Sequence, residues 1–135
     1  IDVNTRKPCD LLSLYDGDIV RYVVSPEENV CPIEGHGRFP FRNAELVRTI
    51  ETYYSDIDIN GHVNSIKYIE HILDLFPREK FTGQGIRRFE IAYKTEAYMG
   101  DRLNFYLQPV DENEFDVEVR KNESETVCQA KICFK

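Results

Sequence analysis

The architecture of this chain is easiest to read at residues 54–68, Tyr54-Ser-Asp-Ile-Asp-Ile-Asn-Gly-His-Val-Asn-Ser-Ile-Lys-Tyr68. Polar side chains alternate along this stretch, each two residues from the next: Asp56, Asp58, Asn60, His62 and Asn64. An apolar run from Ile66 to Phe76 follows directly. Because bringing carboxylates, an amide and an imidazole to the start of a core helix costs free energy, their concentration here indicates a site that performs chemistry.

The stretch also predicts the start of a long helix. Asn60 is the expected N-cap, residues 61–76 the expected helix, and Pro77 follows its end. On that helix His62 falls on the apolar side, which faces the core. Since apolar residues cover a wide arc of the helical wheel, the helix must be wrapped by other elements.

The wrapping elements are predicted to be strands, one before the helix and four after it. Residues 46–54 are the first. Alternating apolar residues mark the other four: Phe89, Ile91 and Tyr93; Leu103, Phe105 and Leu107; Phe115, Val117 and Val119; and Cys128, Ala130, Ile132 and Phe134. Short links such as residues 99–101 predict antiparallel hairpins between consecutive strands. We therefore expect an α+β fold in which an antiparallel sheet curls around a helix.

Residues 1–44 are less regular. Residues 1–5 are predicted to be a strand end, Pro8 to open a short helix through Leu14, and the Pro- and Gly-rich residues 25–43 to form an extended connector. The composition changes at Ala44, so we expect a domain border there. The immediate strand-like start at Ile1 suggests a fragment of a longer polypeptide.

Composition excludes several function classes. The chain has 135 residues and a net charge of -7, which argues against nucleic-acid binding. Its apolar stretches fall short of the roughly 20 residues that span a bilayer, so we expect no membrane association. The cysteines, which have no metal-ligand spacing, are predicted to be free thiols in a reducing cytoplasm: Cys9, Cys31, Cys128 and Cys133. We expect no metal and no cofactor.

The polar residues of the stretch suggest acid–base chemistry on a carbonyl. Asp58 near His62 would fix the imidazole tautomer, and Asn60 offers a donor and an acceptor. Gly61 lets the backbone approach a ligand, and N–H groups of the first helical turn would suit an oxyanion. Capping would explain Asp58 or Asn60 alone, but it does not explain the whole set.

Asp58-Ile-Asn60-Gly-His62-Val-Asn64-Ser-Ile-Lys-Tyr68 resembles the signature of acyl-acyl-carrier-protein (acyl-ACP) thioesterases, bacterial enzymes similar to the plant fatty acyl-ACP thioesterases. Tyr93-Lys-Thr-Glu96 matches the downstream motif that carries a catalytic Glu, and Thr5-Arg6-Lys7-Pro8 resembles the exit from the first of two tandem hot-dog domains. The resemblance implies that residues 1–44 are the end of a preceding hot-dog domain plus a linker, and that residues 45–135 are the C-terminal catalytic hot-dog domain. Plant members often have Cys after this Glu, but here it is Ala97, which counts against a cysteine nucleophile.

The resemblance implies hydrolysis of fatty acyl-ACP to free fatty acid and ACP, a step of fatty acid biosynthesis. Glu96 or His62 would activate water, Asp58 would orient or polarise, and Asn60 would hold the thioester carbonyl. In single-domain hot-dog thioesterases the Asp that matches Asp58 is the nucleophile or base, so this choice stays open. The implied substrate-binding residues are Gly61, Val63 and Asn64.

Strand alternation conflicts with the role of Glu96. It places Tyr93 and Glu96 on opposite faces unless a bulge intervenes near Thr95. The alternative reading of Glu96 is a solvated carboxylate paired with Lys94.

The implied partners are an acyl carrier protein and a second hot-dog domain, either the missing N-terminal half or another copy. Because carrier proteins are acidic, a local basic patch would attract them, and the candidates are Arg87, Arg88, Lys94 and Arg102, with Lys67 near the site. Other functions within the fold remain open: acyl-CoA hydrolysis, dehydration of a hydroxyacyl thioester, or a non-catalytic acyl-binding module.

Overall fold

The computed structural model describes Asp2, residues 4–23, Ser25, Glu27, Gly35, Gly37, residues 39–83 and residues 85–135. The chain divides into two compact units, Ile1–Gly35 and His36–Lys135. Some sequence predictions fall on residues outside the described ones, namely Ile1, Val3, Pro26, Cys31 and Pro32.

The described residues of the first unit include a 3₁₀ helix, η1 (Leu11–Tyr22), capped by Asp10, whose Oδ1 accepts the Leu12 N–H at 3.0 Å. The helix predicted from Pro8 to Leu14 therefore begins later and extends further. Asn4 and Thr5 form a turn closed by the Asp2 carboxylate, not the predicted strand end. The assignment of residues 1–44 to a preceding hot-dog domain and its linker stays a prediction.

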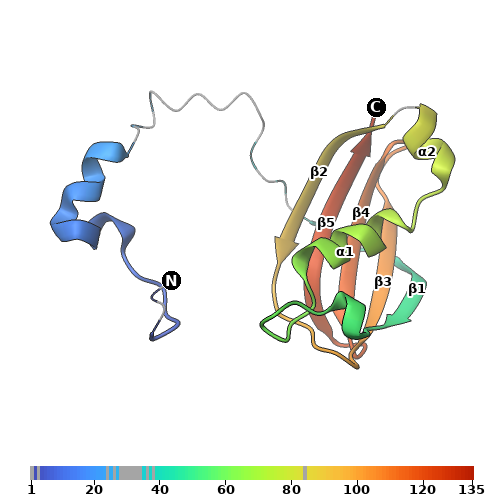
Figure 1. The fold of residues 1–135 in the computed structure, drawn as a ribbon. Coiled ribbons are helices and arrows are strands. Elements are labelled where there is room, and N and C mark those ends of the chain that lie inside the picture. Colours follow the sequence, from blue (N-terminus) through green and yellow to red (C-terminus); the bar gives the residue numbers. More distant parts are fainter. Residues whose placement is uncertain are drawn as a thin grey trace. The chain divides into compact units, whose positions relative to one another are not determined.

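The second unit is a five-stranded antiparallel sheet in the order β1-β3-β4-β5-β2, with α1 lying across one face (Figure 1). The strands are β1 (Glu45–Glu51), β2 (Ile86–Tyr93), β3 (Arg102–Pro109), β4 (Glu114–Lys121) and β5 (Glu125–Phe134). The helices are η2 (Tyr54–Asp56), α1 (Ser65–Leu73) and α2 (Arg78–Gly83). The predicted α+β architecture of an antiparallel sheet around a helix is confirmed, and so are the four strands predicted after the helix.

The core lies between α1 and the sheet. α1 buries Tyr68 and Ile72, which are four residues apart and so share one face of the helix. Apolar residues of the alternating strands, including Phe105 and Val117, pack against them. Ile66 is 57% exposed, so the sheet covers one side of α1 and does not enclose its whole circumference.

The prediction of hairpins between all consecutive strands is wrong at one link. β3, β4 and β5 are joined by hairpins, but β2 pairs with β5 and β3 pairs with β1. The segment between β2 and β3 crosses the end of the sheet, where Gly100 N–H donates to Thr52 O at 3.1 Å and His62 forms an isolated bridge with Tyr98. These contacts place the segment against the loop that precedes α1.

The face of the sheet opposite α1 carries buried polar side chains: Glu90, Asn104, Asp116 and Glu118. Lys131 Nζ lies 2.7 Å from Glu114 Oε1 and 3.1 Å from Asp116 Oδ1. Burial raises the pKa of Asp116, and Lys131 offsets part of that rise. Lys131 therefore compensates part of the negative charge on this face.

A segment before β1 is hydrogen-bonded to this face of the sheet, and we call it the outer strap: Gly37 and residues 39–43. Gly37 N–H donates to Glu90 Oε2 at 3.1 Å, and the N–H groups of Arg42 and Asn43 donate to Gln108 Oε1 at 2.9 and 3.0 Å. The end of the predicted connector is thus fastened to both β2 and β3.

Candidate active site

The loop before α1 is a tight turn and not the first turn of a helix. Ile57 and Val63 form an antiparallel bridge, and Asp58 N–H donates to His62 O at 2.8 Å. Asp58 Oδ1 accepts the N–H groups of Asn60 and His62 at 2.8 and 3.3 Å. Gly61 has a φ of 81°, a left-handed conformation that interrupts any helix. We call residues 57–63 the site loop.

The helix begins at Ser65, and its N-cap is Asn64, whose Oδ1 accepts the Ile66 N–H at 3.0 Å. The predictions that Asn60 caps the helix and that His62 lies on its apolar face are therefore wrong. The polar alternation of the stretch belongs to a turn, which hydrophobic periodicity does not detect.

His62 is oriented by the segment that follows β2. Its backbone bridges Tyr98, its ring meets the Tyr98 ring edge-on at 5.2 Å, and the neighbouring Val63 N–H donates to Ala97 O at 2.8 Å. His62 Nε2 lies 3.3 Å from Glu96 Oε2. The two side chains are 26% and 56% exposed, so water reaches both.

A bulge at the end of β2 brings Glu96 to this position. The N–H groups of Lys94 and Thr95 both donate to Val127 O, at 2.7 and 3.2 Å, so two consecutive residues face one partner. Lys121 Nζ donates to Glu96 O at 2.8 Å and holds the segment from its other side. The strand register thus shifts by one, and Glu96 faces His62 instead of pairing with Lys94.

A cavity of about 240 Å³ lies beside this pair and is lined by Asp58, His62, Val63, Ser65, Tyr68, Tyr93, Thr95 and Glu96. Four of the predicted site residues, Asp58, His62, Val63 and Glu96, therefore meet at one cavity. Asn60 and Gly61 are exposed in the turn, and the Asn64 side chain is used as the helix cap. These three residues do not line the cavity.

Sequence reasoning missed two tyrosines of the cavity, Tyr68 and Tyr93. Their rings lie 6.0 Å apart, and the Tyr93 hydroxyl donates to Ser65 O at 3.0 Å. Tyr68 is 3% exposed. Its place four residues before Ile72, on the buried face of α1, was the available signal.

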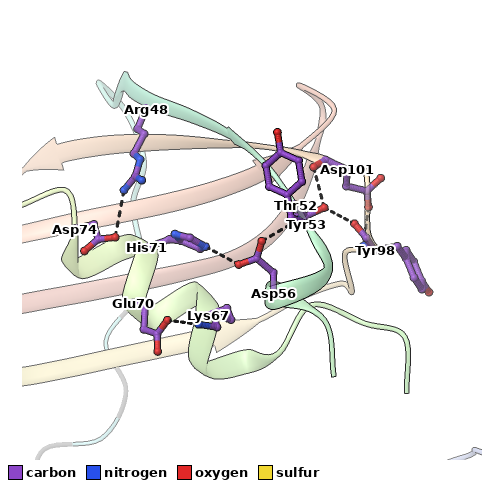
Figure 2. A network of polar contacts seen from close by, with 10 residues as sticks. All are labelled: Arg48, Thr52, Tyr53, Asp56, Lys67, Glu70, His71, Asp74, Tyr98 and Asp101. Carbon is purple, nitrogen blue, oxygen red and sulfur yellow. Dashed lines mark hydrogen bonds and ion pairs between the residues drawn. The ribbon is translucent and has the colours of Figure 1, made fainter. Parts of the chain in front are cut away.

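A second polar network fixes the start of the site loop to α1 (Figure 2). His71 Nε2 donates to Asp56 Oδ1 at 3.0 Å, Tyr53 N–H donates to Asp56 Oδ2 at 2.9 Å, and Asn64 N–H donates to Asp56 O at 2.7 Å. Burial of the Asp56 carboxylate opposes ionisation, but the Tyr53 N–H and His71 outweigh it and lower its pKa. Asp56 thus holds both ends of the turn together.

Among the described residues, no group of His, Cys, Asp and Glu side chains is arranged to hold a metal ion. Cys9, Cys128 and Cys133 are free thiols, and burial raises the pKa of Cys128 to about 12.

No helix in the described part of the chain is long and apolar enough to cross a membrane. The chemistry of the cavity is that of an imidazole, two carboxylates and two phenols.

Comparison with known proteins identifies relatives of this chain. The chain is 52% identical to an acyl-ACP thioesterase of Bacteroides thetaiotaomicron over its whole length, with a TM-score of 0.85, and spans 53% of that protein. A chloroplastic dodecanoyl-ACP hydrolase of Cinnamomum camphora is 44% identical over 50 residues, which are 37% of this chain and 13% of that protein.

A 12:0-ACP thioesterase of Umbellularia californica shares the fold, with a TM-score of 0.68 at 19% identity over 88% of this chain and 46% of that one. The chain thus spans about half the length, or less, of these relatives. Residues 42–135 match the family model described as the acyl-ACP thioesterase C-terminal domain. By this match, the chain belongs to the acyl-ACP thioesterase family and contains its C-terminal hot-dog domain.

Proposed function

We propose that this chain is the catalytic half of an enzyme that hydrolyses fatty acyl thioesters on acyl carrier protein. The observation that carries the proposal is the 3.3 Å contact between His62 Nε2 and Glu96 Oε2 at a cavity that Asp58 also lines. Family membership and the acyl-ACP thioesterase of Bacteroides thetaiotaomicron support the substrate class.

His62 is proposed as the general base and Glu96 as the group that orients it. His62 takes a proton from water, the water oxygen bonds to the carbonyl carbon, and the carbon–sulfur bond then breaks. The thiol of the carrier leaves with a proton from the imidazolium, and the products are a fatty acid and the free carrier. A carboxylate beside the ring stabilises the imidazolium that forms, and general-base catalysis is typically worth about 100- to 10000-fold.

Asp58 is proposed to polarise and position the reacting groups. Its Oδ1 holds the site loop through the N–H groups of Asn60 and His62, while the residue lines the cavity. The same position makes Asp58 the alternative base or nucleophile. Asn60 is exposed in the turn, so binding of the thioester carbonyl by Asn60 requires the loop to rearrange when substrate enters.

The proposal includes a second hot-dog domain as a structural partner. Large apolar side chains are exposed on the site loop and on the segments beside it, namely Tyr54, Ile59, Tyr98 and Met99. Ile59 is 103% exposed at the turn itself. Several large exposed apolar side chains around one loop are typical of a surface that another domain covers.

The test is hydrolysis of acyl-ACP and acyl-CoA by the intact protein and its His62→Ala, Asp58→Ala and Glu96→Ala variants. Each variant should lose at least about 100-fold in kcat/KM on acyl-ACP. Glu70→Ala, which removes an exposed carboxylate from α1 outside the cavity, is the matched control. Activity of all three variants within threefold of the parent would refute the site, and preference for acyl-CoA would identify an acyl-CoA hydrolase instead.

A further inference from the structure

Tyr68 carries a polar atom that the fold leaves unsatisfied. The residue is 3% exposed, and its hydroxyl has no hydrogen-bond partner among the described residues. A buried hydroxyl without a partner loses the hydrogen bonds that it made to water, so such groups are rare and usually meet a water or a ligand. The residue lines the same cavity as His62 and Glu96.

The hydroxyl itself is buried and lies near the segment that carries Glu96. It approaches the Ala97 backbone N–H without the geometry of a hydrogen bond. Ala97 directly follows Glu96, and Ala97 O accepts the Val63 N–H at 2.8 Å, next to His62. The phenol therefore ends beside the two segments that carry the His62–Glu96 pair.

The hydroxyl keeps its proton at neutral pH. Burial raises the pKa of Tyr68, and the nearby Ala97 N–H offsets only part of that rise. Tyr68 is therefore a hydrogen-bond donor and not a base. A thioester carbonyl oxygen has lone pairs and no hydrogen, so it can accept the hydrogen bond that the Tyr68 hydroxyl does not make within the described protein.

We propose that Tyr68 donates a hydrogen bond to the carbonyl oxygen of the bound thioester and to the oxyanion that forms there. The inference rests on the proposed function and names a residue that touches the reacting atoms. When the water oxygen bonds to the carbonyl carbon, the π electron pair moves to the oxygen, and the Tyr68 O–H donates to that charge. Tyr68 keeps its proton, and the pair returns to the carbonyl as the carbon–sulfur bond breaks and the carrier sulfur takes the proton of the imidazolium.

Tyr93 shows why the assignment goes to Tyr68. Both phenols line the cavity, but the Tyr93 hydroxyl donates to Ser65 O at 3.0 Å and is already satisfied. Asn60, the amide that sequence reasoning assigned to the carbonyl, does not line the cavity. Tyr68, a residue of the cavity lining, supplies a side-chain donor that is buried and has no partner among the described residues.

The first test is Tyr68→Phe in the intact protein, which removes the oxygen and keeps the ring. Loss of one oxyanion donor should lower kcat on acyl-ACP by about 100-fold with little change in KM. The melting temperature should stay equal or rise, because an unpaired buried hydroxyl is removed. Tyr106→Phe, on the opposite face where Arg120 covers the ring, is the control and should keep the parent's kcat.

The second test measures binding and does not depend on turnover. A carrier-linked ketone analogue keeps the carbonyl, whereas a thioether analogue lacks it. Tyr68→Phe should weaken ketone binding at least about fivefold and leave thioether binding unchanged. Equal affinity of parent and variant for the ketone, or a variant kcat within threefold of an active parent, would overturn the inference. An inactive parent would contradict the proposed hydrolysis, and the ketone-to-thioether ratio would still decide the role of Tyr68.

Discussion

His62 Nε2 lies 3.3 Å from Glu96 Oε2 because Lys94 and Thr95 share the carbonyl of Val127. Without that bulge, strand alternation would turn the Glu96 side chain away from the cavity. The catalytic assignment of Glu96 therefore depends on a local defect in the pairing of β2 with β5.

If Glu96 acts by orienting His62, their substitutions should not be additive. Glu96→Gln keeps the size of the side chain but removes its charge, and it should lower kcat by about 100-fold with little change in KM. His62→Ala should cost at least as much, and the double variant should be no slower than His62→Ala alone. Steady-state kinetics of the three variants on acyl-ACP provide the measurement. Multiplicative losses would show that the two residues act independently.

Asp56 should make the stability of the domain depend on pH. Its pKa is lowered in the folded protein, so the folded state binds fewer protons than the unfolded chain as Asp56 titrates. The stability contributed by ionised Asp56 is complete above its ordinary pKa of about 4 and is lost as the pH falls through the folded pKa. In urea unfolding, Asp56→Asn should be less stable than the parent at pH 7, and this difference should shrink toward pH 3.

Asp74→Asn is the control for that experiment. Asp74 pairs with Arg48 at 3.5 Å but is 62% exposed, so its substitution should change stability little at either pH. A loss in Asp56→Asn that is equally large at pH 7 and pH 3 would rule out the electrostatic explanation.

The two asparagines of the stretch should differ in their contribution to stability. Asn64→Ala removes the cap of α1, whose Oδ1 accepts the Ile66 N–H, and should cost about 1 kcal/mol. Asn60→Ala removes an exposed turn side chain and should cost at most a few tenths of that amount. The free energies of unfolding of the two variants are compared directly. A larger loss of stability in Asn60→Ala than in Asn64→Ala would show that Asn60 is the helix cap, as the sequence predicted.

Recognition of the carrier protein should rely on Arg87 and Lys94. Of the predicted basic patch, Arg88 pairs with Glu90, and Arg102 lies 3.8 Å from Glu51. Arg87 and Lys94 are exposed and form no ion pair among the described residues. Reversing both to Glu should raise KM for acyl-ACP about tenfold at low salt and less at high salt. An uncharged acyl-N-acetylcysteamine thioester should be hydrolysed as before. Equal effects on both substrates would exclude a docking role.

The exposed apolar side chains around the site loop predict association. A native mass spectrum of this chain alone should show a dimer, and in the intact protein the second domain should cover Ile59. Hydrogen exchange at the site loop should then be slower in the intact protein than in this chain alone. A stable 15.8 kDa monomer would contradict the proposed pairing.

Strand alternation was enough to predict most of the sheet. Phe115, Val117 and Val119 pack into the core as their spacing requires, since a strand buried on one face repeats every two residues. The helix start was misplaced because Gly61 and the Ile57–Val63 bridge form a turn, which has no hydrophobic period. The path from β2 to β3 depends on contacts of that segment with Thr52 and His62, which lie far from it in sequence.

The site was predictable in its residue types but not in its geometry. Asp58, His62 and Glu96 were identified from the motif, and the structure brings them to one cavity. The bulge that turns Glu96 inward depends on the Val127 carbonyl, which belongs to a different strand. Tyr68 was not predicted as a site residue because a tyrosine on the buried face of a helix is usually a core residue. It is distinguished by a hydroxyl that has no hydrogen-bond partner among the described residues.

The outer strap determines where the polypeptide can be shortened. A protein trimmed to begin at Glu45 would lose the backbone N–H groups that donate to Glu90 and Gln108. Such a truncation would weaken the sheet from its back while leaving every residue of the reaction centre intact. Proteolysis before Gly37 should therefore leave a folded domain that keeps the outer strap. Proteolysis at Asn43 removes the strap and should lower the free energy of unfolding of the domain.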